Sequence, residues 1–198
     1  MKKAEIIIVT LSIIALAMNL LLVPGGGVLT VLALSTLSII YFYLGFALFN
    51  DIRLRKIFKK DSYKEISSSR ILGAVGAGIT LSMTTIGLMF KFQSWPGADL
   101  NLGVGLFGLL IVTIIGLTKY FKNKSDYYTR IFKRAAIFGG LGLIIMLTPE
   151  TTLVEFKYRN HPEYVNALKK AMADPDNSEL WDNVETERQK MNNEKELE

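Results

Sequence analysis

The chain lacks cysteine and has only one histidine, His161, among its 198 residues. Without cysteine there is no disulfide, no thiolate zinc site and no cysteine nucleophile. A single histidine does not supply the ligand set of a zinc ion, and the P-loop, nucleophile-elbow and zinc-protease motifs are missing as well. These absences predict a protein that is not an enzyme, with no catalytic residues, no metal site and no cofactor.

Charged side chains are missing from five apolar segments, which are residues 6–23, 28–49, 71–90, 102–117 and 135–147. A helix needs about 20 apolar residues to cross the hydrocarbon of a bilayer. The last segment approaches that length only if it extends back to Ile131, with Lys133 and Arg134 reaching up to the interface. Hydrophobic residues make up 50% of the chain, and its mean hydropathy is +0.30. The sequence predicts an all-α polytopic membrane protein with about five transmembrane helices, the fifth over 131–148, and a short C-terminal helical hairpin.

Positive charge is unevenly divided among the connections between these segments. Residues 51–70 carry seven Lys or Arg and residues 119–134 carry six, whereas the connections at 24–27 and 92–101 carry none. Cytoplasmic loops are the basic ones in membrane proteins. The net charge of +5 is therefore attributed to topology, with membrane lipids as neighbours and no nucleic-acid partner. The pattern predicts a multi-pass protein of the cell inner membrane with a cytoplasmic N-terminus.

Two features leave alternatives open in this topology. If 131–148 crosses, the C-terminal tail is periplasmic; if it does not cross, the tail is cytoplasmic. Residues 1–17 have a basic head, an apolar core and an Ala-x-Ala ending at Ala17, so a cleaved signal peptide is the alternative to a first transmembrane helix. The apolar run continues to Val23, and Glu5 is unusual in a signal head, which favours the uncleaved helix.

Small residues recur four apart in the third and fifth segments, a spacing that lets two membrane helices approach closely. They are expected to form helix-packing faces and to favour a compact bundle, a homo-oligomer or contact with other subunits of a membrane complex. The residues of these faces are Gly73, Ala77, Gly78, Ala135, Gly139 and Gly140.

The chain from Pro149 onward differs from the rest in its charge. It holds twelve acidic and seven basic residues, a net charge of −5, while residues 1–148 have a net charge of +10. The sequence therefore predicts a transmembrane helical bundle over 1–148 and an acidic hydrophilic helical tail over 149–198. Within the tail, Tyr164, Leu168 and Trp181 are expected to pack against each other, the bundle or a partner.

The connection between the third and fourth segments contains Trp95, Pro96 and Gly97 in succession. Pro-Gly suits the central positions of a type II turn. Trp95 and Lys91 are expected to anchor the turn at the membrane interface, and Asp99 is expected to cap the following helix.

A glycine-bearing helix, then Phe90-Lys91, then Trp95-Pro96-Gly97-Ala98, then Gly105-Leu106 resembles the membrane hairpin of the GldL-type component of the gliding-motility and type IX secretion motor. The resemblance covers about residues 73–117. It implies a helical hairpin within a membrane complex. The family has a histidine where this chain has Ser94, and a membrane-embedded glutamate where residues 106–112 have no acid, so the resemblance does not extend to a proton-driven motor.

These observations predict a non-enzymatic accessory or scaffold subunit of an inner-membrane complex, acting through protein–protein interaction. The alternative is a small transporter or channel subunit, in which substitutions at Asn19 or Lys91 or at hydroxyl residues of the second segment would change the flux of a solute.

Overall fold

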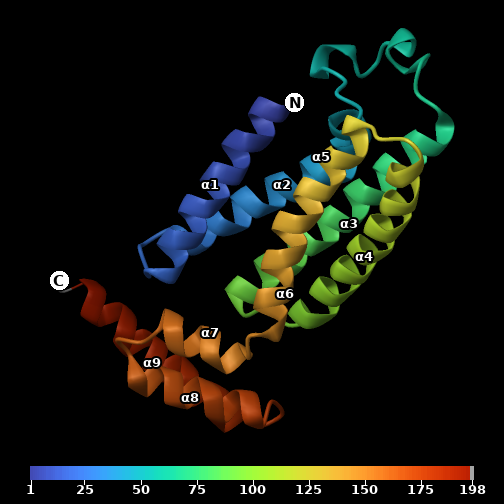
Figure 1. Ribbon diagram of the computed structural model, residues 1–198. Helices are drawn as coiled ribbons and strands as arrows, with labels where there is room; N and C mark the ends of the chain where they lie inside the picture. The colour runs from blue at the N-terminus through green and yellow to red at the C-terminus, as the bar shows by residue number, and fades with distance from the viewer. Residues whose placement is uncertain (197–198) are drawn as a thin grey trace. The chain divides into compact units, whose positions relative to one another are not determined.

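The computed structural model describes residues 1–196, which are helical with no strand (Figure 1). The chain divides into two compact units. Unit 1 comprises Met1–Asn19 and Val23–Leu147, and unit 2 comprises residues 20–22 and the chain from Thr148. The all-helical class expected from the sequence is confirmed.

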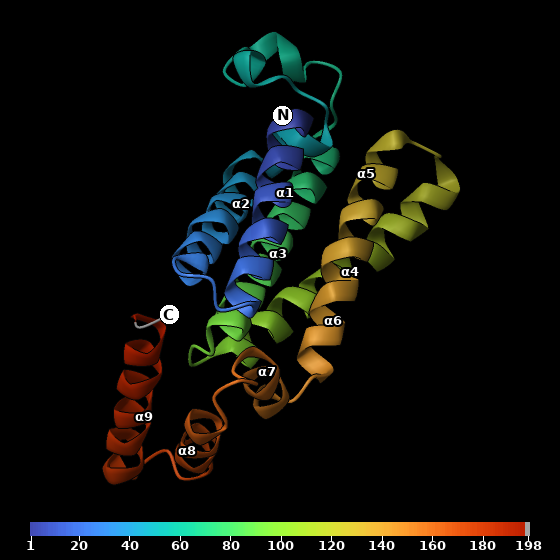
Figure 2. The ribbon, with the colours of Figure 1, turned by 90° about the vertical axis from the view of Figure 1, so that its left-hand side faces the viewer.

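Unit 1 is a bundle of long helices connected by short turns and by one longer connection that projects at one end (Figures 1 and 2). The longer connection, residues 50–67, contains two short 3-10 helices, η1 (Leu54–Lys56) and η2 (Lys60–Tyr63). The bundle elements are α1 (Lys2–Leu20), α2 (Gly26–Phe49), α3 (Ser68–Gln93), α4 (Ala98–Lys122), α5 (Asp126–Arg134), the π-helical segment η3 (Ala135–Gly139) and α6 (Gly140–Leu147).

Four of these helices, α1 to α4, are long and apolar enough to cross a membrane. A fifth candidate arises if Asp126–Leu147 and α7 (Glu150–Lys157) are counted together as one broken span. The expected number of about five transmembrane helices therefore agrees with the count that includes the broken span. Without the broken span, the count is four.

Helix α3 lies between α2 and α4 and packs closely against both. A Cβ atom on Gly78 would lie 2.4 Å from the carbonyl oxygen of Tyr41, and a Cβ atom on Gly45 would lie 2.8 Å from the Cα of Gly78. On the other side of α3, a Cβ atom on Gly105 would lie 2.5 Å from the Thr84 nitrogen. Because only glycine permits these approaches, backbone packs directly against backbone on two sides of α3.

Helix α1 is more polar on its buried side than on its exposed side. Its buried residues are Glu5, Ser12, Ala15 and Asn19. Its exposed large residues are Ile6, Ile7, Leu11, Ile13 and Ile14. This is the reverse of a helix in water, where the apolar stripe faces the core. The arrangement suits a helix whose outer surface meets hydrocarbon and whose polar groups are satisfied within the protein.

Unit 2 is built from α7, α8 (Pro162–Ala173) and α9 (Ser178–Glu196). Pro162 occupies the first turn of α8, where its missing N–H is not needed. Helices α8 and α9 enclose a small hydrophobic core of Tyr164, Ala167, Ala171, Val184 and Met191. Lys169 of α8 forms an ion pair with Glu155 of α7. The last two residues of the predicted tail, 197 and 198, lie outside the described residues.

The contact between α2 and α3 gives a matched pair of substitutions. Gly78→Ala places a methyl group against the Tyr41 backbone and is expected to destabilise the protein by about 1–3 kcal/mol, whereas a Cβ atom on Gly76 meets nothing within 4 Å. Gly76→Ala should leave thermal unfolding of the detergent-solubilised protein unchanged or slightly raise its midpoint. Equal effects of the two substitutions would contradict the close α2–α3 approach.

Candidate functional site

The N-terminus, the 50–67 connection and the α4–α5 connection lie at one end of unit 1 (Figures 1 and 2). A cluster of paired charged side chains lies toward this end. The outer part of this cluster is centred on Asp51, two residues after the end of α2. Its Oδ1 lies 3.0 Å from the Lys2 ammonium, and its Oδ2 lies 3.5 Å from Nη2 of Arg130. The hydrogen bond from Lys2 lowers the pKa of Asp51 below its ordinary value. Arg130 also donates to the carbonyl of Phe49 at 3.0 Å, so this group connects α1, α2 and α5.

The inner part of the cluster is centred on a carboxylate that is almost fully buried. Glu5 of α1 is 6% exposed. Arg134 donates from Nε to Glu5 Oε1 at 2.5 Å and from Nη2 to Glu5 Oε2, and the Tyr41 hydroxyl donates to Oε1 at 2.9 Å. Bidentate binding of a carboxylate by arginine forms some of the strongest charge-assisted hydrogen bonds in proteins. One side chain of α1 is thereby joined to α2 and to the end of α5.

Local structure fixes the two partners of Glu5. Arg134 donates through Nη1 to the carbonyl of Arg130 at 2.9 Å, and its guanidinium lies 5.4 Å from the ring centre of Phe49. The π-helical segment η3 begins at the next residue and carries Phe138, whose ring packs edge-on against Tyr41 at 5.4 Å. A π-helical turn changes the direction in which the following side chains point, and here it brings Phe138 onto Tyr41.

These polar contacts add to the packing of α1, of which only one side is buried. Helix α1 is not among the closely packed helix pairs of the bundle. Further along α1, Thr30 donates to the Ala15 carbonyl at 2.9 Å, and Asn19 donates to the Phe92 carbonyl at 3.4 Å. Since an unpaired polar group in an apolar environment costs several kcal/mol, each of these bonds favours the docked position of α1.

The ion pair between Glu5 and Arg134 was not predicted from the sequence. Glu5 precedes the first apolar segment, and Arg134 was expected to reach outward to the membrane interface. Instead, Arg134 turns inward, while Lys133 is exposed. The available signal was an acid at the start of one span and an arginine at the start of another, both on the side of the basic connections.

The turn after α3 differs from its expected form in two respects. Lys91 does not reach the interface as an exposed anchor: it is 3% exposed, and its Nζ lies 2.5 Å from Oδ1 of Asp99. Asp99 does not cap α4, because the N-cap is Gly97, with φ at +79°. Helix α3 is longer than expected, so Lys91 lies within it and faces the first turn of α4. Trp95, next to Pro96, is 40% exposed and packs edge-on against Phe90 at 5.3 Å.

The six residues of the expected packing faces lie in different surroundings. Ala77 and Gly78 are buried, and Gly78 contacts α2. A Cβ atom on Gly73 would lie 2.9 Å from the Tyr127 hydroxyl, and one on Gly139 would lie 3.7 Å from a methyl group of Leu109. Ala135 is partly buried, and a Cβ atom on Gly140 meets nothing within 4 Å. The expected packing face of α3, with Gly73, Ala77 and Gly78, therefore makes its contacts within this chain. Gly140, in contrast, borders open space.

In unit 2, the three residues expected to make contacts separate into two groups. Tyr164 belongs to the hydrophobic core and Leu168 packs against it. Trp181 is 41% exposed, and its indole N–H donates to the Pro175 carbonyl at 2.9 Å. Of these three residues, only Trp181 is exposed.

No cluster of three or more His, Asp or Glu side chains with the geometry to hold a metal ion occurs among residues 1–196. The single histidine, His161, is the N-cap residue of α8.

No protein-family model, curated protein or solved structure matches this chain. Its fold and site define a class: an all-helical protein with four to five helices long and apolar enough to cross a membrane. The resemblance of residues 73–117 to the GldL-type hairpin stays a prediction.

The buried ion pair predicts a strong dependence of stability on both partners. Glu5→Gln leaves Arg134 without its counter-charge, and Arg134→Gln leaves Glu5 without its own. Each should reduce the free energy of unfolding by about 3–5 kcal/mol, and the double variant should lose less than the sum of the two, as measured by unfolding of the detergent-solubilised protein. Lys133→Gln is the matched control, with an expected change within about 0.5 kcal/mol. Strict additivity of the two single losses would show that the groups do not interact.

Proposed function

We propose that the protein is a non-enzymatic accessory or scaffold subunit of an inner-membrane complex, in which unit 1 is the membrane anchor and unit 2 binds a partner. The observation that carries the proposal is the division of the chain into an apolar bundle with internally paired charges and a separate compact acidic unit.

The pairing of charges in unit 1 favours an anchoring role. Glu5 pairs with Arg134, and Lys91 pairs with Asp99. Each pair joins two different helices, so each contributes to holding the bundle. Ionisable groups kept within a membrane for transport usually face a pathway or a water-filled cavity, whereas both of these pairs fasten one helix to another.

Unit 2 has the features of a small interaction module. Its own hydrophobic core lies between α8 and α9, so it does not need the bundle to bury Tyr164 or Val184. Trp181 stands on the exposed side of α9, between the exposed Glu179 and Asp182. Tryptophan is enriched among the residues that dominate interfaces. Acidic neighbours favour a partner whose contact surface is basic.

This proposal is tested by gentle solubilisation of the full chain from its own membrane, followed by mass spectrometry of the proteins that remain bound. Trp181→Ala removes the exposed aromatic anchor and is expected to lower partner recovery by tenfold or more, the effect of losing roughly 2 kcal/mol at an interface. Phe156→Ala is the matched control, because Phe156 is an exposed aromatic of α7, and it should leave recovery unchanged. Recovery should also fall with salt, since exposed charges are screened over about 8 Å at physiological ionic strength.

A monomer that retains no other protein, or a partner that both variants retain equally, would contradict the proposed function. Solute flux through proteoliposomes that Lys91→Gln abolishes would instead favour the transporter alternative.

A further inference from the structure

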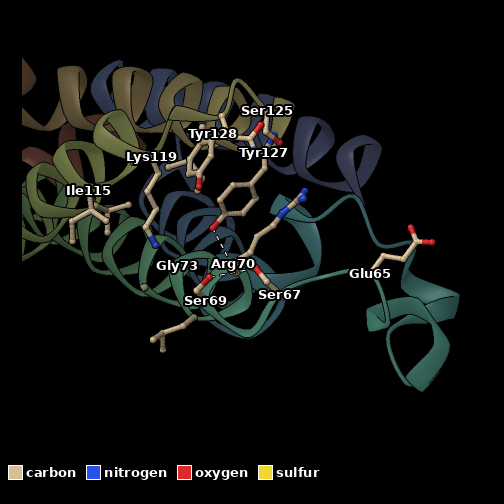
Figure 3. A pocket seen from close by; sticks show the side chains of 16 residues that line it. Glu65, Ser67, Ser69, Arg70, Gly73, Ile115, Lys119, Ser125, Tyr127 and Tyr128 are labelled. Atoms are coloured by element: carbon tan, nitrogen blue, oxygen red, sulfur yellow. Dashed lines mark hydrogen bonds between the residues drawn. The ribbon is translucent and has the colours of Figure 1, made fainter. Parts of the chain in front are cut away.

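A cavity of about 640 Å³ lies in unit 1 between the start of α3, the end of α4 and the start of α5 (Figure 3). It is at the end of the bundle that carries both basic connections. Its volume is in the range of cavities that hold small ligands, about 300–1,000 Å³. Neither of the paired charge groups described above lines it.

The lining of the cavity changes from polar to apolar along the helices. Ser69 and Lys119 line it near the ends of α3 and α4, together with Ser125 of the α4–α5 connection. One to two turns deeper in the same helices, the lining residues are Gly76, Val112 and Ile115. A ligand that follows this lining must have a polar end at the helix termini and an apolar end within the candidate spans.

The polar end carries positive charge that no ion pair within residues 1–196 neutralises. Lys119 forms no ion pair among the described residues, and neither does Arg70. Figure 3 shows the Lys119 side chain extending from α4 toward Gly73 of α3 and Arg70 lying beside the Tyr127 ring. The Arg70 guanidinium is 4.7 Å from that ring centre, and its buried Nε has no hydrogen-bond partner. Glu65 is the one acidic residue of the lining, so the polar end favours an anion.

Glycine keeps the apolar end open. A Cβ atom on Gly76 meets nothing within 4 Å, because this position faces the cavity. At Gly73, the missing side chain lets the Tyr127 hydroxyl approach and donate to the Arg70 carbonyl at 3.0 Å. Tyr127 thereby closes the side of the cavity next to α5, while Leu72 and Ile115, both exposed, border its apolar part.

We propose that this cavity binds one anionic phospholipid of the leaflet that faces the basic connections. Its phosphate lies at the end formed by Lys119, Ser69 and Ser125, and an acyl chain lies along Gly76, Val112 and Ile115. A basic pocket between helices at the membrane surface is a common form of lipid headgroup site. The apolar half of the lining favours a phospholipid over a free phosphate, because a phosphate ion makes no use of that half.

The test reconstitutes the full chain into nanodiscs that contain phosphatidylglycerol and phosphatidylcholine with the same acyl chains. Native mass spectrometry of the released protein then counts the lipids retained by each chain. The wild-type protein should retain phosphatidylglycerol in preference to phosphatidylcholine. Lys119→Gln should reduce that retention about fivefold, since one basic side chain near a membrane surface contributes about 1 kcal/mol. Gly76→Leu, which fills the apolar end, should reduce retention of both lipids.

Two control variants separate a defined site from general attraction. Lys122→Gln removes a neighbouring charge of the last turn of α4 that does not line the cavity, and Gly140→Leu adds the same side chain at another open glycine. Both should retain lipid as the wild type does, and circular dichroism should show that all four variants are equally helical.

Equal loss in Lys122→Gln and Lys119→Gln, unchanged retention in Gly76→Leu, or no preference for the anionic lipid would each overturn the proposal. Displacement of the lipid by millimolar inorganic phosphate would identify a free-phosphate site and would overturn the lipid assignment. Persistence of the bound lipid in phosphate would support it.

Discussion

The contact on which the position of α1 depends is the buried ion pair between Glu5 and Arg134. A carboxylate that is almost without solvent must be neutralised by a partner of opposite charge and by hydrogen bonds, and Glu5 receives three such bonds from Arg134 and Tyr41. This requirement brings together the start of α1, the middle of α2 and the end of α5. It also explains why Arg134 points into the bundle although solvent is close by.

The bundle is held by two kinds of interaction in different places. Helices α2, α3 and α4 approach until backbone touches backbone at Gly78, Gly45 and Gly105. Helix α1 approaches α2 in the same way at its C-terminal end, where a Cβ atom on Gly26 would lie 2.7 Å from the Asn19 nitrogen. Polar bonds from Glu5, Thr30 and Asn19 fasten the helix as well. The first kind depends on the shape of small residues and the second on pairing of polar groups. Both are effective in hydrocarbon, where apolar side chains gain little from leaving lipid for protein.

Much of the fold was predictable because apolar runs and breakers are local signals. The candidate spans follow from runs of apolar residues, and the turn before α4 follows from Pro96 and Gly97, whose φ of +79° suits glycine. The Glu5–Arg134 pair was not predictable in this way. Its members are 129 positions apart, and each lies near the end of a helix, where a charge normally reaches water.

The errors at Lys91 and Asp99 have a similar origin. The local sequence suggested an interface anchor for Lys91 and a helix cap for Asp99. Only the folded turn brings Nζ of Lys91 to 2.5 Å from Oδ1 of Asp99. Likewise, Tyr164 and Leu168 are spaced as an amphipathic helix requires, but the spacing does not reveal that α9 covers them. Sequence patterns identify which face of a helix is apolar and leave open what packs against it.

We propose that α1 turns its polar side chains toward the bundle and its apolar side chains toward lipid. Because the chain has no cysteine, single cysteines placed along α1 can each carry one nitroxide label, and the collision rate of each label with oxygen, which concentrates in lipid, can be measured in reconstituted membranes. High oxygen accessibility is expected at positions 6, 7, 13 and 14 and low accessibility at positions 12, 15 and 19. Uniform accessibility along α1, or maxima at positions 12, 15 and 19, would contradict it.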